Sequence, residues 1–296
     1  MSPPCTPGMH GSLNGFIFDI DGVLLHGDTP VPGAVETVRK LARAGYAVAY
    51  LSNNSASTSA ACAERLARHG FPATEKTALT AAMVAAQFAT TYLADKDVVV
   101  VGMPAMLEAF EQAGVKMLPL ERADQADAMI MGRDEAFTYD RLVVLMRTAR
   151  RLGAFFATGL DARLPVGNGQ FVPGAGAMIT AVAYASGVRP QVLGKPAATA
   201  AEAAAGALGL PAAEVAVVGD SLTEDIAMGH AVGMHTVLVL SGTATAADVA
   251  ALPADDQPTV VLQSVSHLPG WLARCDELAG PARLDRVRRV SRPRAD

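Results

Sequence analysis

Short apolar runs alternate with stretches of helical periodicity along most of this chain. The continuous apolar residues at 16–18 and 215–218 are typical of buried strands. Between such runs, apolar side chains recur at helical spacing, as at Val35 and Val38, and Gly45 ends that helix. Repeated strand–helix units predict a parallel sheet with helices on both faces. The same pattern continues in strands at 47–51, 236–240 and 259–262, and in helices ending near 69 and 208.

The middle of the chain has its own alternation of strands and helices. Strands are expected at 98–101, 115–118, 128–131 and 154–158, and helices near 104–113, 139–152 and 174–186. This pattern predicts a separate α/β unit inserted between two halves of the first. The expected organisation is a leader over 1–14, a discontinuous core over 15–80 and 188–278, an inserted domain over 81–187, and a tail over 279–296.

Composition narrows the function classes. The chain has 296 residues, 51% of them hydrophobic, so a sizeable core is expected. Its net charge of -5 gives no general attraction for nucleic acid, and no apolar run approaches the ~20 residues of a membrane span. The start lacks the features of a signal peptide. The cysteines Cys5, Cys62 and Cys275 lie far apart, which favours free thiols and a cytoplasmic location.

The tail after Gly280 is rich in arginine. Its ordinary interpretation is a solvated segment, and an anion-binding or partner-binding tail is the alternative. The arginines are Arg283, Arg286, Arg288, Arg289, Arg292 and Arg294.

Two carboxylates follow the first apolar run. Asp19 and Asp21 are spaced so that they project to the same face of an extended strand, and Gly22 comes directly after them. Two acids aimed at one point can divide the work, because one can attack while the other moves a proton. They also attract a divalent cation, which removes their mutual repulsion. By itself, however, such a sequence is also an ordinary turn.

Three more polar segments follow apolar strands further along the chain. Taken one at a time, these segments are more typical of a turn, a surface lysine and a helix cap than of a functional site. If the sheet is parallel, all four segments gather at its carboxyl edge, and together they supply the groups that phosphoryl transfer needs. These segments hold Ser52, Asn53 and Asn54, then Lys195, then Asp220 and Asp225.

The order of these motifs resembles the haloacid dehalogenase (HAD) superfamily of phosphatases. DIDGVL, SNNS, GKP and GDSLTEDI occur here in the family's order, and the resemblance covers about Gly15 to Leu252. Matches at 132–134, 137–139, 157–158 and 173–176 narrow it to the branch with a class C2 cap, which includes NagD-type, phosphoglycolate and pyridoxal phosphatases. The resemblance implies a Rossmann-like parallel-sheet core with an inserted α/β cap domain.

The resemblance also implies a role for each motif residue. Asp19 would be the nucleophile that forms an aspartyl-phosphate, and Asp21 would protonate the leaving oxygen and then activate water. Ser52 with Asn53 and the adjacent Asn54 would hold the phosphoryl group, and Lys195 would offset negative charge. The implied Mg²⁺ site comprises Asp19, the Asp21 carbonyl, Asp220 and, as an orienting group, Asp225.

In this family the cap selects the substrate, and the loop at 158–165 resembles the loop that reaches over the active site. Its candidate specificity residues are Asp161, Arg163 and Leu164. Many relatives have Asn where this chain has Gly159, and pyridoxal phosphatases have His where it has Leu164, so pyridoxal phosphate is disfavoured. The implied partner is a small phosphorylated metabolite, without nucleic acid or membrane, and a homodimer through the cap stays open.

Several other classes of protein fit these motifs less well. Dehalogenases usually lack the second acid, and a nucleotide-cofactor dehydrogenase needs GxGxxG after its first strand. A receiver domain is shorter and has no such insertion. A non-catalytic or regulatory protein on the same scaffold, or another HAD-type hydrolase reaction, remains an alternative. The sequence does not choose among sugar phosphates, glycerol phosphate, phosphoglycolate, nucleoside monophosphates and a pathway-specific ester.

Overall fold

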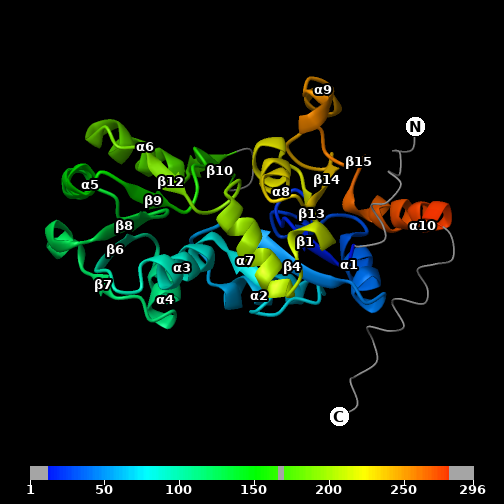
Figure 1. The fold of residues 1–296 in the computed structure, drawn as a ribbon, viewed down its shortest axis with the longest axis horizontal. Helices are drawn as coiled ribbons and strands as arrows, with labels where there is room; N and C mark the ends of the chain where they lie inside the picture. Colours follow the sequence, from blue (N-terminus) through cyan, green and yellow to red (C-terminus); the bar gives the residue numbers. More distant parts are fainter. Residues whose placement is uncertain (1–12, 166–169, 280–296) are drawn as a thin grey trace, which may run out of the picture. The chain divides into compact units, whose positions relative to one another are not determined.

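The structure of this chain, a computed structural model, describes residues 13–165 and 170–279 (Figure 1). The described residues divide into two compact units. The first comprises 13–50, 67–72 and 205–279, and the second comprises 51–66, 73–165 and 170–204. The predicted leader up to residue 12 and the arginines of the predicted tail lie outside the described residues.

Most of a parallel sheet in the order β15-β14-β13-β1-β4-β5 lies in the first unit, whereas β5 and the last two residues of β4 belong to the second unit. β1 pairs in parallel with both β13 and β4, so that Phe16 lies opposite Ala216 on one side and Val48 on the other. Phe16 and Ile17 are fully buried, as expected for a central strand covered on both faces. The prediction of a parallel sheet is therefore confirmed. Its strands are β1 (Gly15–Phe18), β4 (Ala47–Ser52), β5 (Ala78–Thr80), β13 (Val215–Gly219), β14 (His235–Val239) and β15 (Val260–Leu262).

The other elements of the first unit are mostly short. A small antiparallel hairpin, β2 with β3, follows the first strand, and a π-helix, η3, follows β13. Helices α2 (Ser59–Arg68) and α7 (Ala198–Leu208) have residues in both units. The remaining bounds are β2 (Leu25–His26), β3 (Thr29–Pro30), α1 (Ala34–Arg43), η2 (Ala212–Glu214), η3 (Leu222–Ile226), α8 (Ala227–Ala231), α9 (Ala246–Ala250), η4 (Ala254–Asp256), η5 (Val265–His267) and α10 (Leu268–Ala279).

The second unit has a parallel sheet of its own, in the order β12-β9-β8-β6-β7. A two-stranded antiparallel hairpin, β10 with β11, accompanies it. The strands are β6 (Val98–Val101), β7 (Met117–Leu118), β8 (Ala128–Met131), β9 (Phe155–Ala157), β10 (Arg163–Pro165), β11 (Phe171–Pro173) and β12 (Pro190–Val192). The helices are α3 (Ala81–Tyr92), α4 (Pro104–Gln112), η1 (Leu120–Gln125), α5 (Tyr139–Leu152) and α6 (Ala175–Ser186).

Helices cover both faces of this second sheet (Figure 1). Alternate strand residues point to opposite faces, so Val98 and Ile130 join a core with α3 and α4. Val99 and Met129 join a core with α5 and α6 on the other face. The predicted α/β character of the insertion is confirmed.

Several elements of the second unit differ from the prediction. Helix α3 was not expected, because it is rich in alanine and mostly buried, and so lacks the polar stripe that marks an amphipathic helix. β7 covers only Met117–Leu118 rather than 115–118. The β10–β11 hairpin has three-residue strands, too short to show an alternating pattern.

The expectation of three free cysteines is wrong for Cys275. This residue is buried in α10 and engaged in a disulfide, whereas Cys62 carries a buried, reduced thiol. The separation of cysteines along a sequence does not fix their separation in space. The argument for a cytoplasmic location therefore loses this support. Among the described residues, every helix is too short or too polar to cross a lipid bilayer.

Candidate active site

The first two acids lie immediately beyond β1. The Asp19 amide donates to the Val218 carbonyl at 2.9 Å, which continues the β1–β13 pairing by one residue. Asp19 is buried, whereas Asp21 is exposed. Gly22 has a φ of +87°, and a Cβ there would lie 2.5 Å from the Asp220 Oδ2. Glycine is therefore required both by the turn and by the close approach of Asp220.

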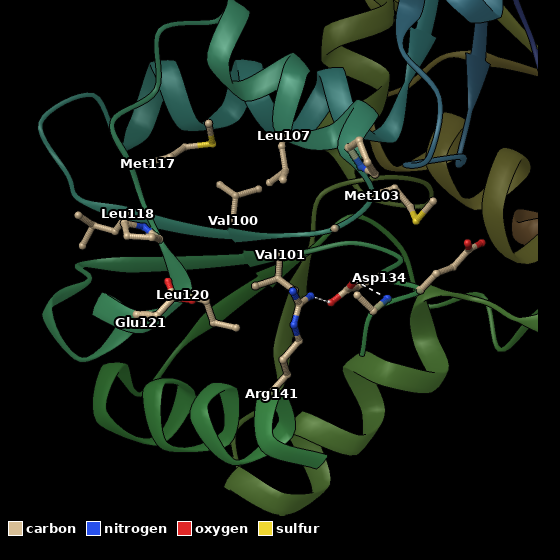
Figure 2. A pocket seen from close by; sticks show the side chains of 15 residues that line it. Val100, Val101, Met103, Leu107, Met117, Leu118, Leu120, Glu121, Asp134 and Arg141 are labelled. Atoms are coloured by element: carbon tan, nitrogen blue, oxygen red, sulfur yellow. Dashed lines mark hydrogen bonds and ion pairs between the residues drawn. The ribbon is translucent and has the colours of Figure 1, made fainter. Parts of the chain in front are cut away.

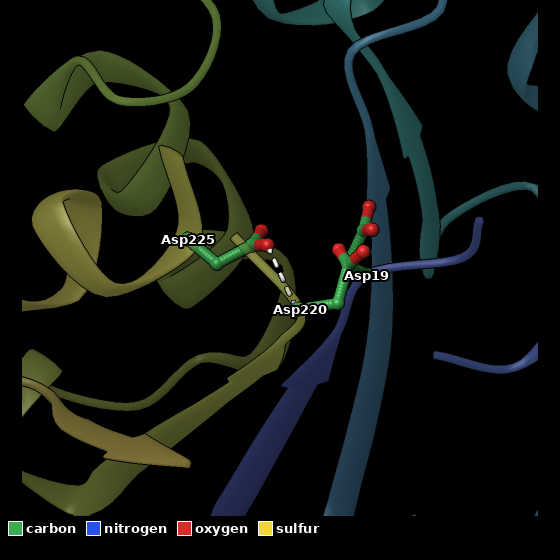
Figure 3. Close-up of side chains that lie close together, drawn as sticks. All are labelled: Asp19, Asp220 and Asp225. Atoms are coloured by element: carbon green, nitrogen blue, oxygen red, sulfur yellow. Dashed lines mark hydrogen bonds between the residues drawn. The ribbon is translucent and has the colours of Figure 1, made fainter. Parts of the chain in front are cut away.

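Three buried carboxylates converge where β1 and β13 end (Figure 3). Asp19 follows β1, Asp220 follows β13, and Asp225 comes from the π-helix η3. One oxygen from each lies within 4.8 Å of the others, and the side chains are 8%, 5% and 1% exposed, respectively. Buried like charges at this separation repel one another unless a cation or a proton neutralises them.

The three acids do not have the same surroundings. Asp225 Oδ2 accepts hydrogen bonds from the backbone amides of Asp220 and Ser221, both at 3.2 Å. Asp225 therefore fixes the turn that presents Asp220. Oxygen donors of this kind suit a hard divalent cation, so the residues present fit the metal that the sequence implies.

A loop after β14, Ser241-Gly242-Thr243, also holds Asp220 and was not predicted. The Thr243 amide donates to Asp220 Oδ2 at 2.7 Å, and the Thr243 Oγ1 donates to the Asp220 carbonyl at 2.9 Å. A Cβ at Gly242 would overlap the Asp220 carboxylate. The available signal was a further polar segment after an apolar strand.

The same loop reaches the turn that carries Asp21. The Ser241 Oγ donates to the Gly22 carbonyl at 2.8 Å, and His26 Nε2 donates to the Ser241 carbonyl at 2.9 Å. The loop thereby connects the turn after β1 to the turn after β13.

The second unit brings two other predicted motifs together. Asn53 Oδ1 accepts a hydrogen bond from the Lys195 amide at 2.9 Å, and Asn53 Nδ2 donates to the Lys195 carbonyl at 3.3 Å. Lys195 is only 4% exposed, which is unusual for a lysine. A Cβ at Gly194 would lie 2.9 Å from the Asn53 Oδ1, so glycine permits this approach.

The neighbours of Asn53 have local roles. Ser52 is buried at the end of β4, and its Oγ accepts from the Asn54 amide at 3.2 Å. The Asn54 Oδ1 accepts from the Ala56 amide at 2.8 Å and so closes a turn. Ser55, which was not singled out from the sequence, accepts from the Arg133 amide at 3.2 Å.

The predicted specificity loop leads into the β10–β11 hairpin. The Asp161 carbonyl accepts a hydrogen bond from the Gly176 amide at 2.9 Å, which attaches the loop to the start of α6. The Arg163 guanidinium lies 4.5 Å from the centre of the Phe171 ring, a cation–π contact across the hairpin. Leu164 pairs with Val172 and is half-buried.

The two groups of predicted residues belong to different units. Asp19, Asp21, Asp220 and Asp225 are in the first. Ser52, Asn53, Asn54, Lys195 and the specificity loop are in the second.

Comparisons with known proteins agree with these observations. Residues 16–116 match the family model described as haloacid dehalogenase-like hydrolase, and 192–268 match a HAD-hydrolase-like model. The chain is 32% identical to a human glycerol-3-phosphate phosphatase, with 79% of this chain and 80% of that protein covered. It is 31% identical to the 5'-nucleotidase YutF of Bacillus subtilis, with 78% and 88% covered.

A solved structure is similar over the fold. A glycerol phosphate phosphatase from Mycobacterium tuberculosis, in complex with calcium, superimposes with a TM-score of 0.79. It is 27% identical, and the match covers 88% of this chain and 76% of that one.

Proposed function

This chain belongs to the haloacid dehalogenase-like hydrolases, and on that premise we propose that it is a Mg²⁺-dependent phosphatase acting on a small phosphorylated metabolite. The observation that carries the proposal is the buried cluster of Asp19, Asp220 and Asp225 at the carboxyl ends of β1 and β13. Relatives named as phosphatases support the reaction class. The relative in complex with calcium supports a divalent cation, and magnesium is our proposal for it.

Asp19, Asp220 and the Asp21 carbonyl would hold the cation, and Asp225 would orient Asp220. When bound, the cation neutralises the carboxylates and part of the phosphate charge. The chain's own residues carry the bond changes. An Asp19 oxygen attacks phosphorus and the bond to the leaving oxygen breaks, which leaves an aspartyl-phosphate.

Asp21 moves the protons in both halves of the reaction. It donates a proton to the leaving oxygen in the first half. In the second half it removes a proton from the water that attacks phosphorus, the Asp19–phosphorus bond breaks, and the Asp19 carboxylate is restored. The exposure of Asp21 suits a group that exchanges protons with substrate and water.

The second unit contributes charge and positioning in this proposal. Ser52 and Asn53 would bind the phosphoryl oxygens, with Asn54 shaping the turn. Lys195 would offset the negative charge of phosphate and nucleophile. The hydrogen bonds of Asn53 to both backbone groups of Lys195 support a shared role for the two residues.

We further propose that 81–187 form a cap, and that 15–80 and 188–278 form the catalytic core. The cap selects the ester through Asp161, Arg163 and Leu164. A cytoplasmic location and a homodimer through the cap stay predictions, which fractionation and sedimentation velocity would test.

The test is a phosphate-release screen. Purified chain is incubated with sugar phosphates, glycerol phosphate, phosphoglycolate, nucleoside monophosphates and p-nitrophenyl phosphate, with Mg²⁺ or with a chelator. We expect release from at least one ester with Mg²⁺ and none with chelator. The Asp19→Asn variant is the matched control, because it keeps the shape of the site without the nucleophile. No release from any ester would favour a non-catalytic role.

A further inference from the structure

The second unit contains a pocket of about 650 Å³ that no step of the proposed reaction uses (Figure 2). Its lining comes entirely from residues 100–141, so it contains neither the Asn53–Lys195 pair nor the specificity loop. Its volume lies within the range of small-molecule sites.

The topology of the sheet places this pocket at a characteristic position. In chain order the strands are β6, β7, β8, β9 and β12, whereas in space β6 lies between β7 and β8. The chain therefore leaves β6 toward one side of the sheet and later continues on the other. Open parallel sheets bind ligands outside the carboxyl ends of the strands at such a reversal. The pocket is lined by Gly102 after β6, Pro119 after β7 and Asp134 after β8.

The walls are mainly apolar and adaptable. In Figure 2, Leu107 of α4, Val100 of β6 and Met117 lie near one another, and Met103, which also lines the pocket, lies further along at the start of α4. Methionine adapts to irregular shapes and makes favourable contacts between sulfur and aromatic rings. This lining favours a flat ring system.

The charges of the lining disfavour an anion. Arg141 is paired with the buried Asp134 through its Nη1 at 2.5 Å (Figure 2). Glu135 is paired with Arg133 at 3.0 Å. In the described part of the chain, Glu121 has no ion pair or hydrogen bond through its carboxylate. A phosphate group would therefore meet a carboxylate and no uncommitted cation, whereas a hydrogen-bond donor would suit Glu121.

The start of α4 offers the complementary group. Its N-cap residue, Met103, makes no side-chain cap hydrogen bond, and it lines the pocket together with Gly102 and Pro104. Pro104 has no amide hydrogen, so the donors that this part of the lining offers are the backbone amides of Gly102 and Met103, just before the helix. A ligand that satisfies both ends of the pocket has a donor for Glu121 and an acceptor for this helix start.

We propose that this pocket binds an uncharged nitrogen heterocycle of nucleobase or nucleoside size. Such a molecule combines a flat ring, ring acceptors and an amino donor. The proposal does not depend on the phosphatase reaction, because its test measures binding directly.

The test is methyl NMR of the full chain labelled at its 12 methionines, titrated with adenosine. We expect saturable shifts at the Met103 and Met117 methyls, with a Kd on the order of 0.1 mM for a ligand of this size. Met228 and Met234, in the first unit, should not shift. Purine riboside, which lacks the amino donor, should bind about tenfold more weakly.

Variants locate the site. Leu107→Trp should fill the pocket and remove the shifts, whereas Tyr92→Trp, on an exposed residue of α3 outside the pocket, should keep them. Glu121→Gln should weaken the binding of adenosine but not the binding of purine riboside. Unchanged Met228 and Met234 signals would show that each variant is folded.

Three results would overturn the proposal. The first is the absence of saturable Met103 and Met117 shifts up to the solubility limit of adenosine. The second is tighter binding of inorganic phosphate or tryptamine, which would assign the pocket to an anion or a cation. The third is adenosine binding that survives Leu107→Trp.

Discussion

At the scale of single residues, the acids of the candidate site differ in their surroundings more than in their chemistry. Asp19 and Asp220 are buried, and the Asp220 carboxylate accepts a hydrogen bond from the Thr243 amide, whereas Asp21 is exposed. A buried carboxylate beside others suits charge stabilisation and attack, and an exposed one can exchange protons. This difference predicts different responses to the same substitution.

Asp19→Asn should reduce phosphate release to background for every ester, because an amide cannot act as the anionic nucleophile.

Asp21→Asn should lower kcat by about 10²–10⁴-fold for an alkyl phosphate, the usual contribution of general acid–base catalysis. Its effect should be milder for p-nitrophenyl phosphate, whose leaving oxygen needs less protonation. Steady-state kinetics on both substrates provide the measurement. Equal losses on the two would rule out the acid–base role of Asp21.

His235 gives a pH prediction outside the site. It begins β14 opposite Ala216, and burial lowers the pKa of its imidazole. The unfolded chain therefore binds a proton more readily, so the free energy of unfolding should fall as the pH decreases through the ordinary histidine pKa of about 6.5. Urea unfolding between pH 5 and 8 would measure this slope. The slope of the unfolding free energy against pH should be smaller in His235→Asn, by an amount that corresponds to less than one bound proton. An unchanged slope would contradict the assignment of this pH dependence to His235.

At the scale of elements, the site is made by turns that follow strands and by hydrogen bonds between those turns. The strands were predicted because continuous apolar runs are local signals, and Asp19, Ser52, Lys195 and Asp220 follow from them as the next polar residues. The hydrogen bond from Thr243 to Asp220 was not predictable, because it joins two loops whose residues are 23 positions apart in the sequence. Helix α3 was not predictable either, because its many alanines give no periodic pattern of apolar and polar residues.

Thr243→Ala should weaken the binding of the divalent cation by about 10–100-fold, the usual effect of losing a group that orients a ligand. Thr243→Ser keeps the hydroxyl and should restore affinity. Mg²⁺ or Mn²⁺ titration by calorimetry measures this without reference to turnover. Gly242→Ala should be more damaging, because the new methyl overlaps the Asp220 carboxylate. Wild-type cation affinity in Thr243→Ala would show that the hydroxyl does not position Asp220.

The specificity loop allows a second prediction at this scale. Leu164→His and Arg163→Ala should change which ester has the highest kcat/KM, since both alter the hairpin that carries the loop. They should barely affect p-nitrophenyl phosphate, a small substrate that needs little from the cap. Phe171→Leu is the control for Arg163, because it removes the stacking ring and keeps the charge. An unchanged ranking of esters in both variants would place specificity elsewhere.

At the scale of the whole molecule, the two units differ in how the chain builds them. The second sheet uses strands between Val98 and Val192 in one continuous stretch. The first sheet places β1 between β4 and β13, so Gly15 pairs with both Ala47 and Val215. Its central strand therefore needs partners from distant parts of the sequence.

This difference predicts an order of folding. Contacts between distant residues form slowly, because the intervening loop must first close. During refolding from urea, the amides of β8 and β9 should become protected from hydrogen exchange before those of β13. Pulse-labelling mass spectrometry would measure the order. Simultaneous protection, or protection of β13 first, would contradict it.

The position of β1 has a consequence for synthesis on the ribosome. When Gly15–Phe18 leaves the exit tunnel, its neighbour β4 is synthesised soon afterwards. Its other neighbour, β13, is complete only when about residue 219 has been made. At 5–20 residues per second, that delay lasts roughly 10–40 s. Throughout it, one edge of a fully apolar strand lacks its permanent neighbour, which makes this nascent segment a natural client for chaperones that shield hydrophobic strands.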